Sequence, residues 1–145
     1  MKSKFHLKLQ HKAMDYMLAK SYWIKAIEMP IPAGVIDIWG LSRSQDYETM
    51  AIEVKVSKKD FRSKSQKYKE YNSGTIANRC YILCPAGLIQ PEEVNPHWGL
   101  LWYKEGKNLI NKKQATFLAM PDRQKLEILI HFLSSGLNIN KPKIE

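Results

Sequence analysis

Two short apolar segments of this chain carry charged residues in their middle, and this combination constrains the fold more than any other feature. Residues 34–39 read Gly-Val-Ile-Asp-Ile-Trp, and residues 51–56 read Ala-Ile-Glu-Val-Lys-Val. Apolar and charged residues alternate in the second segment, which is the period-two pattern of a half-buried β-strand. A charge among buried neighbours is costly unless it is paired or bound to a metal ion. We therefore predict two neighbouring strands in which Asp37, Glu53 and Lys55 form a candidate divalent-metal site.

The same three residues also fit a simpler arrangement. Asp37, Glu53 and Lys55 could form cross-strand ion pairs on the exposed face of an antiparallel sheet, where one such pair stabilises by about 0.2–1 kcal/mol. A carboxylate followed at a distance by a Glu-x-Lys tripeptide is also short enough to occur by chance. The sequence around these residues favours the metal site over this alternative.

The order of predicted elements indicates an α/β fold. We predict helices over residues 5–20, 58–71 and 122–132, and strands over 22–28, 34–39, 51–56, 79–84 and 98–103. Pro30 and Pro32 should end the first strand, and the last helix should be buried and stop near Gly136. A helix between the strands at 51–56 and 79–84 favours a parallel crossover. The result is an α/β sandwich with a mixed central β-sheet flanked by helices.

Length and composition predict one domain, residues 1–137, followed by a loose tail over 138–145. A chain of 145 residues with 44% hydrophobic and 26% charged residues has the composition of an ordinary globular protein. It shows no signal peptide and no apolar run near the ~18 residues that span a bilayer. We therefore expect no membrane association and a cytoplasmic location, in a bacterial cell or encoded by a phage.

Basic residues concentrate directly after the second charged strand. The formal net charge is +9, and residues 56–79 contain seven basic and two acidic residues, a local excess of five. Such a concentration is typical of a surface that contacts a phosphate backbone, although a solvated lysine-rich helix face gives the same pattern. The two cysteines, Cys80 and Cys84, have neither the partners of a zinc site nor an easy disulfide geometry, and we expect buried thiols.

The two charged segments and the residues that follow them resemble a known family. Ile36-Asp37, a gap of fifteen residues, and Glu53-Val54-Lys55 resemble the core signature of the PD-(D/E)XK nuclease superfamily. The run from Val56 to Ser63, the later Lys-Tyr-Lys-Glu-Tyr, and the apolar strand ending in Pro85 are similar to MmcB-type DNA repair proteins. The resemblance covers about residues 28–85 and implies a restriction-endonuclease-like fold.

The resemblance also implies roles for particular residues. The catalytic residues would be Asp37, Glu53 and Lys55, and Mg²⁺, with Mn²⁺ as a substitute, would be bound by Asp37, Glu53 and the carbonyl of Val54. The basic segment would contact DNA through Lys58, Lys59, Arg62, Lys64 and Lys67. Auxiliary positions would be Gln66, Tyr71 and Gln10, the last standing where many members carry a helix glutamate. The alternatives are surface or packing roles for these three residues and a surface position for Glu28.

Two functions follow from these expectations. The first is a metal-dependent hydrolase that cleaves DNA phosphodiester bonds in repair or recombination, as an endonuclease or an exonuclease. The second is a non-catalytic DNA-binding module that keeps the nuclease fold. Cleavage of RNA is a third possibility. The chain could act as a monomer or a homodimer, and its sequence does not specify the preferred nucleic-acid structure.

Overall fold

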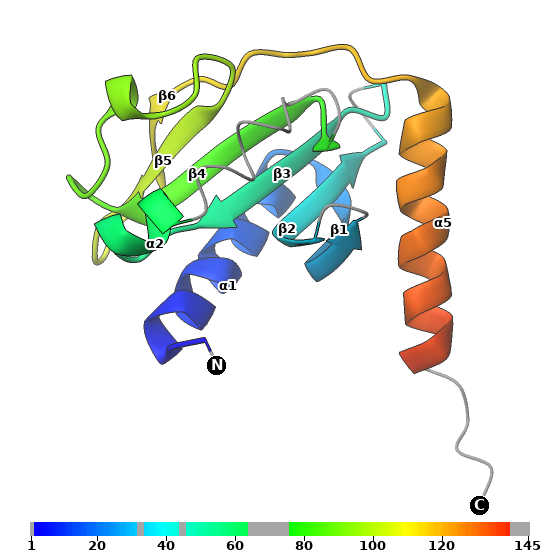
Figure 1. Cartoon of the computed structure of the whole chain (residues 1–145), viewed down its shortest axis with the longest axis horizontal. Helices are drawn as coiled ribbons and strands as arrows, with labels where there is room; N and C mark the ends of the chain where they lie inside the picture. The colour runs from blue at the N-terminus through cyan, green and yellow to red at the C-terminus, as the bar shows by residue number, and fades with distance from the viewer. Residues whose placement is uncertain (1, 32–33, 44–45, 64–75, 140–145) are drawn as a thin grey trace, which may run out of the picture.

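Six strands form one mixed sheet, and their order across the sheet is their order along the chain (Figure 1). The computed structural model describes residues 2–31, 34–43, 46–63 and 76–139. The strands are β1 (Tyr22–Ile31), β2 (Gly34–Ser42), β3 (Thr49–Val54), β4 (Arg79–Pro85), β5 (Gly99–Tyr103) and β6 (Ile110–Lys113). The pairs β3–β4 and β4–β5 are parallel, and the other three are antiparallel.

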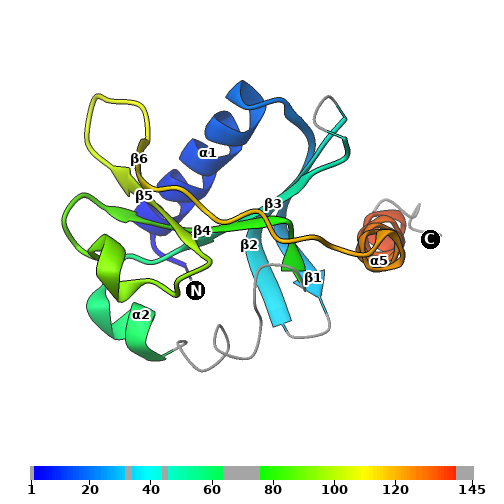
Figure 2. The same cartoon turned by 90° about the horizontal axis from the view of Figure 1, so that it is seen from above.

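Helices cover both faces of this sheet and one of its edges. Helix α1 (Lys4–Ala19) lies on one face and α2 (Lys58–Ser63) on the other, as Figure 2 shows, while the single 3-10 turn η1 (Pro91–Glu93) precedes β5. Helix α5 (Asp122–Ile139) stands beside the β1 edge. None of the helices within the described ranges is long and apolar enough to cross a membrane.

Two apolar clusters hold the layers together. On the α1 face, Leu9, Ala13 and Met17, spaced by four residues, pack against residues of the sheet that include Ile38 and Ile52. On the opposite face, Trp39 and its neighbours pack against residues that include Ile128 of α5. The predicted α/β sandwich with a mixed central sheet is therefore confirmed, as is the parallel pairing of β3 with β4.

The structure extends the first predicted strand and adds a sixth strand that was not predicted. Strand β1 continues through Pro30 to Ile31 instead of ending near Glu28, because β1 is an edge strand and tolerates a residue without an N–H donor. Strand β6 was not predicted at all. Its sequence, Ile-Asn-Lys-Lys, lacks the apolar alternation on which strand recognition depends, and lysines of this kind protect sheet edges from further pairing.

The last helix is longer and more exposed than predicted. It extends to Ile139 and passes Gly136, since a single glycine costs only about 1 kcal/mol in a helix interior and does not end it. A loose tail therefore does not begin at residue 138, and residues 140–145 lie outside the described ranges. Ile128 is buried, but Leu126 and Ile130 are 56% and 53% exposed. Apolar residues occur around this helix on more than the one stripe that faces the sheet.

Gly99 is the position at which packing is most sensitive to an added methyl group. A Cβ atom there would lie 2.4 Å from Cε1 of Tyr81 and 2.6 Å from the main-chain N of Ala115. Both neighbours are buried, so neither can move away easily. We expect Gly99→Ala to lower the free energy of unfolding by about 3 kcal/mol in urea denaturation, the upper part of the usual range for overpacking.

Gly106→Asn is the matched control for this substitution. Its surroundings are open, and its φ of +72° is one that asparagine tolerates. We expect little change in stability for this variant. A loss of less than about 1 kcal/mol in Gly99→Ala would contradict the close approach of β5 to Tyr81.

Candidate metal and catalytic site

Asp37 and Glu53 lie opposite each other at the point where β2 and β3 stop pairing. Ile38 pairs with Ile52, so the next step along the register places Asp37 opposite Glu53. The main-chain N–H of Asp37 donates to Glu53 Oε1 (3.2 Å), and the N–H of Val54 donates to Asp37 Oδ2 (2.9 Å). Each carboxylate thus binds the backbone of the other strand, in place of the ladder hydrogen bonds that would otherwise satisfy these donors.

Both carboxylates and the neighbouring lysine are buried. Asp37, Glu53 and Lys55 are 5%, 3% and 1% exposed. Lys55 follows the end of β3, and its N–H donates to the carbonyl of Leu83 on β4 (2.9 Å). Because Asp37, Glu53 and Lys55 are buried, the alternative of ion pairs on an exposed sheet face is wrong. Helices cover the two faces of the sheet (Figure 2). Three charged residues buried so close together in sequence and register are typical of a functional site.

Helix α1 brings a stripe of polar side chains to Asp37. His6 and Gln10 are four residues apart and lie on one side of α1, and Lys2 lies two residues before the helix begins. Ser3 caps the helix by accepting from the N–H of His6 (3.1 Å). From this stripe, Lys2 Nζ, His6 Nε2 and Gln10 Nε2 approach Asp37 Oδ1 at 2.5, 3.3 and 3.3 Å. The alternative of an exposed helix glutamine at position 10 is wrong, since Gln10 is buried.

Glu28 adds a third carboxylate from the edge strand. Ile27 pairs with Ile38 and Met29 with Ile36, so Glu28 stands opposite Asp37 on the other side of β2. Its backbone adopts a left-handed φ of +59°. Glu28 is exposed, as expected of a surface carboxylate, yet its Oε1 also accepts from Gln10 Nε2 at 3.0 Å. Glu28, Asp37 and Glu53 therefore form a row across three strands, here called the acidic row.

Asp37 is held in its charged form. Burial opposes its ionisation, but hydrogen bonds from the Lys2 ammonium and the Val54 N–H outweigh this effect and keep the pKa of the carboxyl below its ordinary value. Two carboxyl groups that face each other supply hard oxygen donors of the kind that Mg²⁺ prefers, and Mg²⁺ retains waters, so few protein ligands suffice. Within the described part of the chain, no three His, Cys, Asp or Glu side chains converge as a ready-made metal cluster.

The remaining predicted residues lie in different surroundings. Lys58 forms an ion pair with Glu93 (2.5 Å), while Lys59 and Arg62 are exposed on α2. Lys64, Gln66, Lys67 and Tyr71 lie outside the described residues. Both cysteines are buried thiols outside any disulfide, as expected, and burial raises the pKa of Cys84 to about 11, so its thiol stays protonated at neutral pH.

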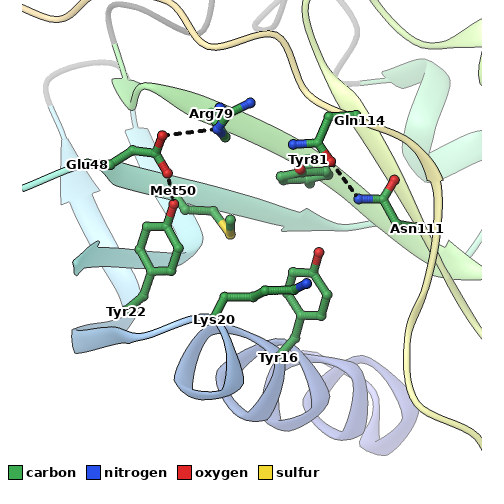
Figure 3. A pocket seen from close by; sticks show the side chains of 9 residues that line it. All are labelled: Tyr16, Lys20, Tyr22, Glu48, Met50, Arg79, Tyr81, Asn111 and Gln114. Atoms are coloured by element: carbon green, nitrogen blue, oxygen red, sulfur yellow. Dashed lines mark hydrogen bonds and ion pairs between the residues drawn. The ribbon is translucent and has the colours of Figure 1, made fainter. Parts of the chain in front are cut away.

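Sequence reasoning did not find Lys2 and His6. The sequence does contain a signal for His6, because its spacing of four from Gln10 identifies one side of a helix. Sequence reasoning found no comparable signal for a polar pocket of about 200 Å³ at the C-terminal end of α1 (Figure 3). The side chains that line this pocket are Tyr16, Lys20, Tyr22, Glu48, Met50, Arg79, Tyr81, Asn111 and Gln114.

The polar groups of this pocket largely bind one another. Glu48 accepts hydrogen bonds from the hydroxyl of Tyr22 and from Arg79 Nε, the latter at 3.0 Å, and Asn111 donates to Gln114 at 3.0 Å (Figure 3). Burial raises the pKa of Tyr22, so that its hydroxyl remains a donor to Glu48. Through Glu48, which lies just before β3, these contacts link Tyr22 of β1 with Arg79 of β4.

The fold and the site together define an α/β sandwich with buried charged residues where two central strands stop pairing. No protein-family model matches this chain, and no curated protein matches it. Its structure is similar to that of the SPO1766 protein of unknown function from Silicibacter pomeroyi. The TM-score is 0.70 at 15% sequence identity, over 94% of this chain and 92% of the other. This similarity supports the fold.

Proposed function

We propose that this chain is a metal-dependent nuclease that hydrolyses DNA phosphodiester bonds. The observation that supports this function best is the burial of Asp37, Glu53 and Lys55 together at the end of the β2–β3 pairing. Burying three charged groups together is costly for folding, and such clusters of buried ionisable groups are typical of functional sites. The exposed Lys59 and Arg62 side chains on α2 fit a polyanionic substrate.

The proposed mechanism assigns a separate task to each residue. Asp37 and Glu53 would hold Mg²⁺ or Mn²⁺, with the carbonyl of Val54 as a further oxygen ligand. When bound, this ion would supply Lewis acidity and a water molecule of lowered pKa. Lys55 would orient the attacking water and stabilise the negative charge that develops on the phosphate. Lys59 and Arg62 would contact the DNA backbone, which fixes the strand relative to these groups.

One observation favours the alternative of a DNA-binding module without catalysis. Gln10 is neutral where many members of the resembled family carry a carboxylate on the first helix, and its side chain donates to Asp37. A smaller negative charge weakens the attraction for a divalent ion. Both functions require DNA affinity that falls steeply with salt, because lysine contacts with phosphate release counterions.

A cleavage assay tests this proposal. Single-stranded, duplex and branched DNA, and a matched single-stranded RNA, would each be incubated with Mg²⁺, Mn²⁺ or EDTA, with Glu53→Gln in parallel. We expect cutting of DNA that requires the metal and that Glu53→Gln lacks. Tight, salt-sensitive binding without cutting of any substrate would instead support the binding module, and cutting of RNA alone would change the substrate class.

A further inference from the structure

A single ammonium group stands between two members of the acidic row. Lys2 Nζ lies 2.5 Å from Asp37 Oδ1 and 3.2 Å from Glu28 Oε1. The amide of Gln10 bridges the same two carboxylates, at 3.3 Å from Asp37 and 3.0 Å from Glu28. Asp37 and Glu28 are thus held as a pair that shares one cation, and the position of Lys2 Nζ marks where a positive charge is bound.

The two lysines near the acidic row differ in how freely they can leave it. Lys55 is buried, whereas the side chain of Lys2 is 32% exposed and that of Glu28 is 42% exposed. A long side chain at the water boundary can turn its ammonium into solvent. Because the Asp37 side chain is only 7% exposed, its carboxylate then needs another cation as its partner. Lys2 is therefore a cation of the acidic row that a metal ion can replace, whereas the Lys55 side chain is enclosed by the protein.

We propose that Asp37 and Glu28 form one cation site, for which the Lys2 ammonium and an oxygen-binding divalent cation compete. This inference rests on the proposed metal-dependent function and extends the metal site beyond Asp37 and Glu53. Glu28 supplies, from the edge strand, the negative charge that Gln10 does not supply from the helix. The Lys2 ammonium keeps the carboxylates paired with a positive charge and moves into solvent when a metal binds.

Binding of Mn²⁺ alone, measured by calorimetry, tests this competition. We expect Lys2→Met to bind Mn²⁺ about tenfold more tightly than the unmodified chain, because a positive charge beside the ion is removed. In the Lys2→Met variant, Glu28 no longer binds the Lys2 ammonium. Comparing this variant with the double variant Lys2→Met/Glu28→Gln therefore measures the effect of Glu28 alone on Mn²⁺ affinity. We expect this double variant to bind Mn²⁺ about tenfold more weakly than Lys2→Met.

Lys8 and Glu105 provide a matched control pair. Lys8 lies on α1, and its Nζ lies 3.2 Å from Glu105 Oε2, the same separation as between Lys2 and Glu28. We expect Lys8→Met and Lys8→Met/Glu105→Gln to change Mn²⁺ affinity by less than about twofold, since distant exposed charges are screened. Lys2→Arg keeps the charge and should leave the affinity near that of the unmodified chain.

The possible results separate this inference from the proposed function. Suppose that the unmodified chain binds Mn²⁺ and cuts DNA, and that Lys2→Met binds Mn²⁺ equally or more weakly. The proposed competition between Lys2 and the metal is then wrong, while the proposed nuclease function is supported. If Glu28→Gln has no effect in the Lys2→Met background, Glu28 is not part of the cation site. If neither the unmodified chain nor Lys2→Met binds Mn²⁺, both the inference and the metal-dependent function are wrong. Tighter binding by Lys2→Met and weaker binding by the double variant would support the proposal.

Discussion

Replacing Lys55 with methionine is expected to reduce metal-dependent DNA cleavage by about 10²–10³-fold while metal binding persists, because the substitution removes a donor that acts on the transition state. Lys55 is 1% exposed, and methionine has a similar shape without the charge. The carboxylates of Asp37 and Glu53 remain in place to bind the metal. Cleavage rates at saturating Mg²⁺, together with calorimetric Mg²⁺ affinity, would measure the two effects separately.

Lys59→Met is the matched control for this substitution. Lys59 lies four residues further along the chain and is exposed on α2. Its replacement should weaken DNA binding and lower the salt dependence of that binding, with the cleavage rate of bound DNA unchanged. Circular dichroism would show whether each variant is folded. Cleavage by Lys55→Met at the rate of the unmodified protein would remove Lys55 from the catalytic assignment.

Replacing Trp39 with alanine is expected to lower the free energy of unfolding by about 3–5 kcal/mol, the range found when a large aromatic side chain is removed from a core. Trp39 lies on β2, two residues after Asp37, and is fully buried. Its indole Nε1 also donates to the carbonyl of Ile76 at 3.2 Å. The substitution would leave a cavity and a buried carbonyl without this donor, and equilibrium denaturation in urea would measure the loss.

Trp23→Ala tests whether burial is the cause of this loss. Trp23 lies on the adjacent edge strand and is 60% exposed. We expect its replacement to change stability by no more than about 0.5 kcal/mol, as for most surface substitutions. A loss of less than 2 kcal/mol in Trp39→Ala, or equal losses in both variants, would contradict the packing of Trp39 between the sheet and the segments that cover it.

The sequence predicted those parts of the fold whose local pattern and tertiary environment agree. Strands β2, β3 and β4 are apolar runs in the middle of the sheet, and α1 has its buried residues at helical spacing, so periodicity alone identified them. Strand β6 was not predicted, because an edge strand needs few apolar residues and so lacks the pattern that identifies a strand. The length of α5 was underestimated because glycine stops a helix only where the chain also turns away.

The site was predicted in part for a similar reason. Asp37, Glu53 and Lys55 are conspicuous because they interrupt apolar strands, and the structure brings Asp37 and Glu53 opposite each other. Lys2 and Glu28 are ordinary surface residue types in polar surroundings. Their contacts with Asp37 depend on where α1 crosses the sheet and on the pairing of β1 with β2, which are properties of the tertiary structure.

Because each strand pairs with the next one along the chain, the sheet can grow by successive addition as the polypeptide is synthesised. Pairing between neighbours closes short loops, which costs little chain entropy and favours rapid folding. The acidic row and the side chains of Lys2, His6 and Gln10 that contact it all come from residues 2–53, so they leave the ribosome before β4, β5 and β6. The charged centre of the molecule is therefore synthesised before the strands that complete the far half of the sheet.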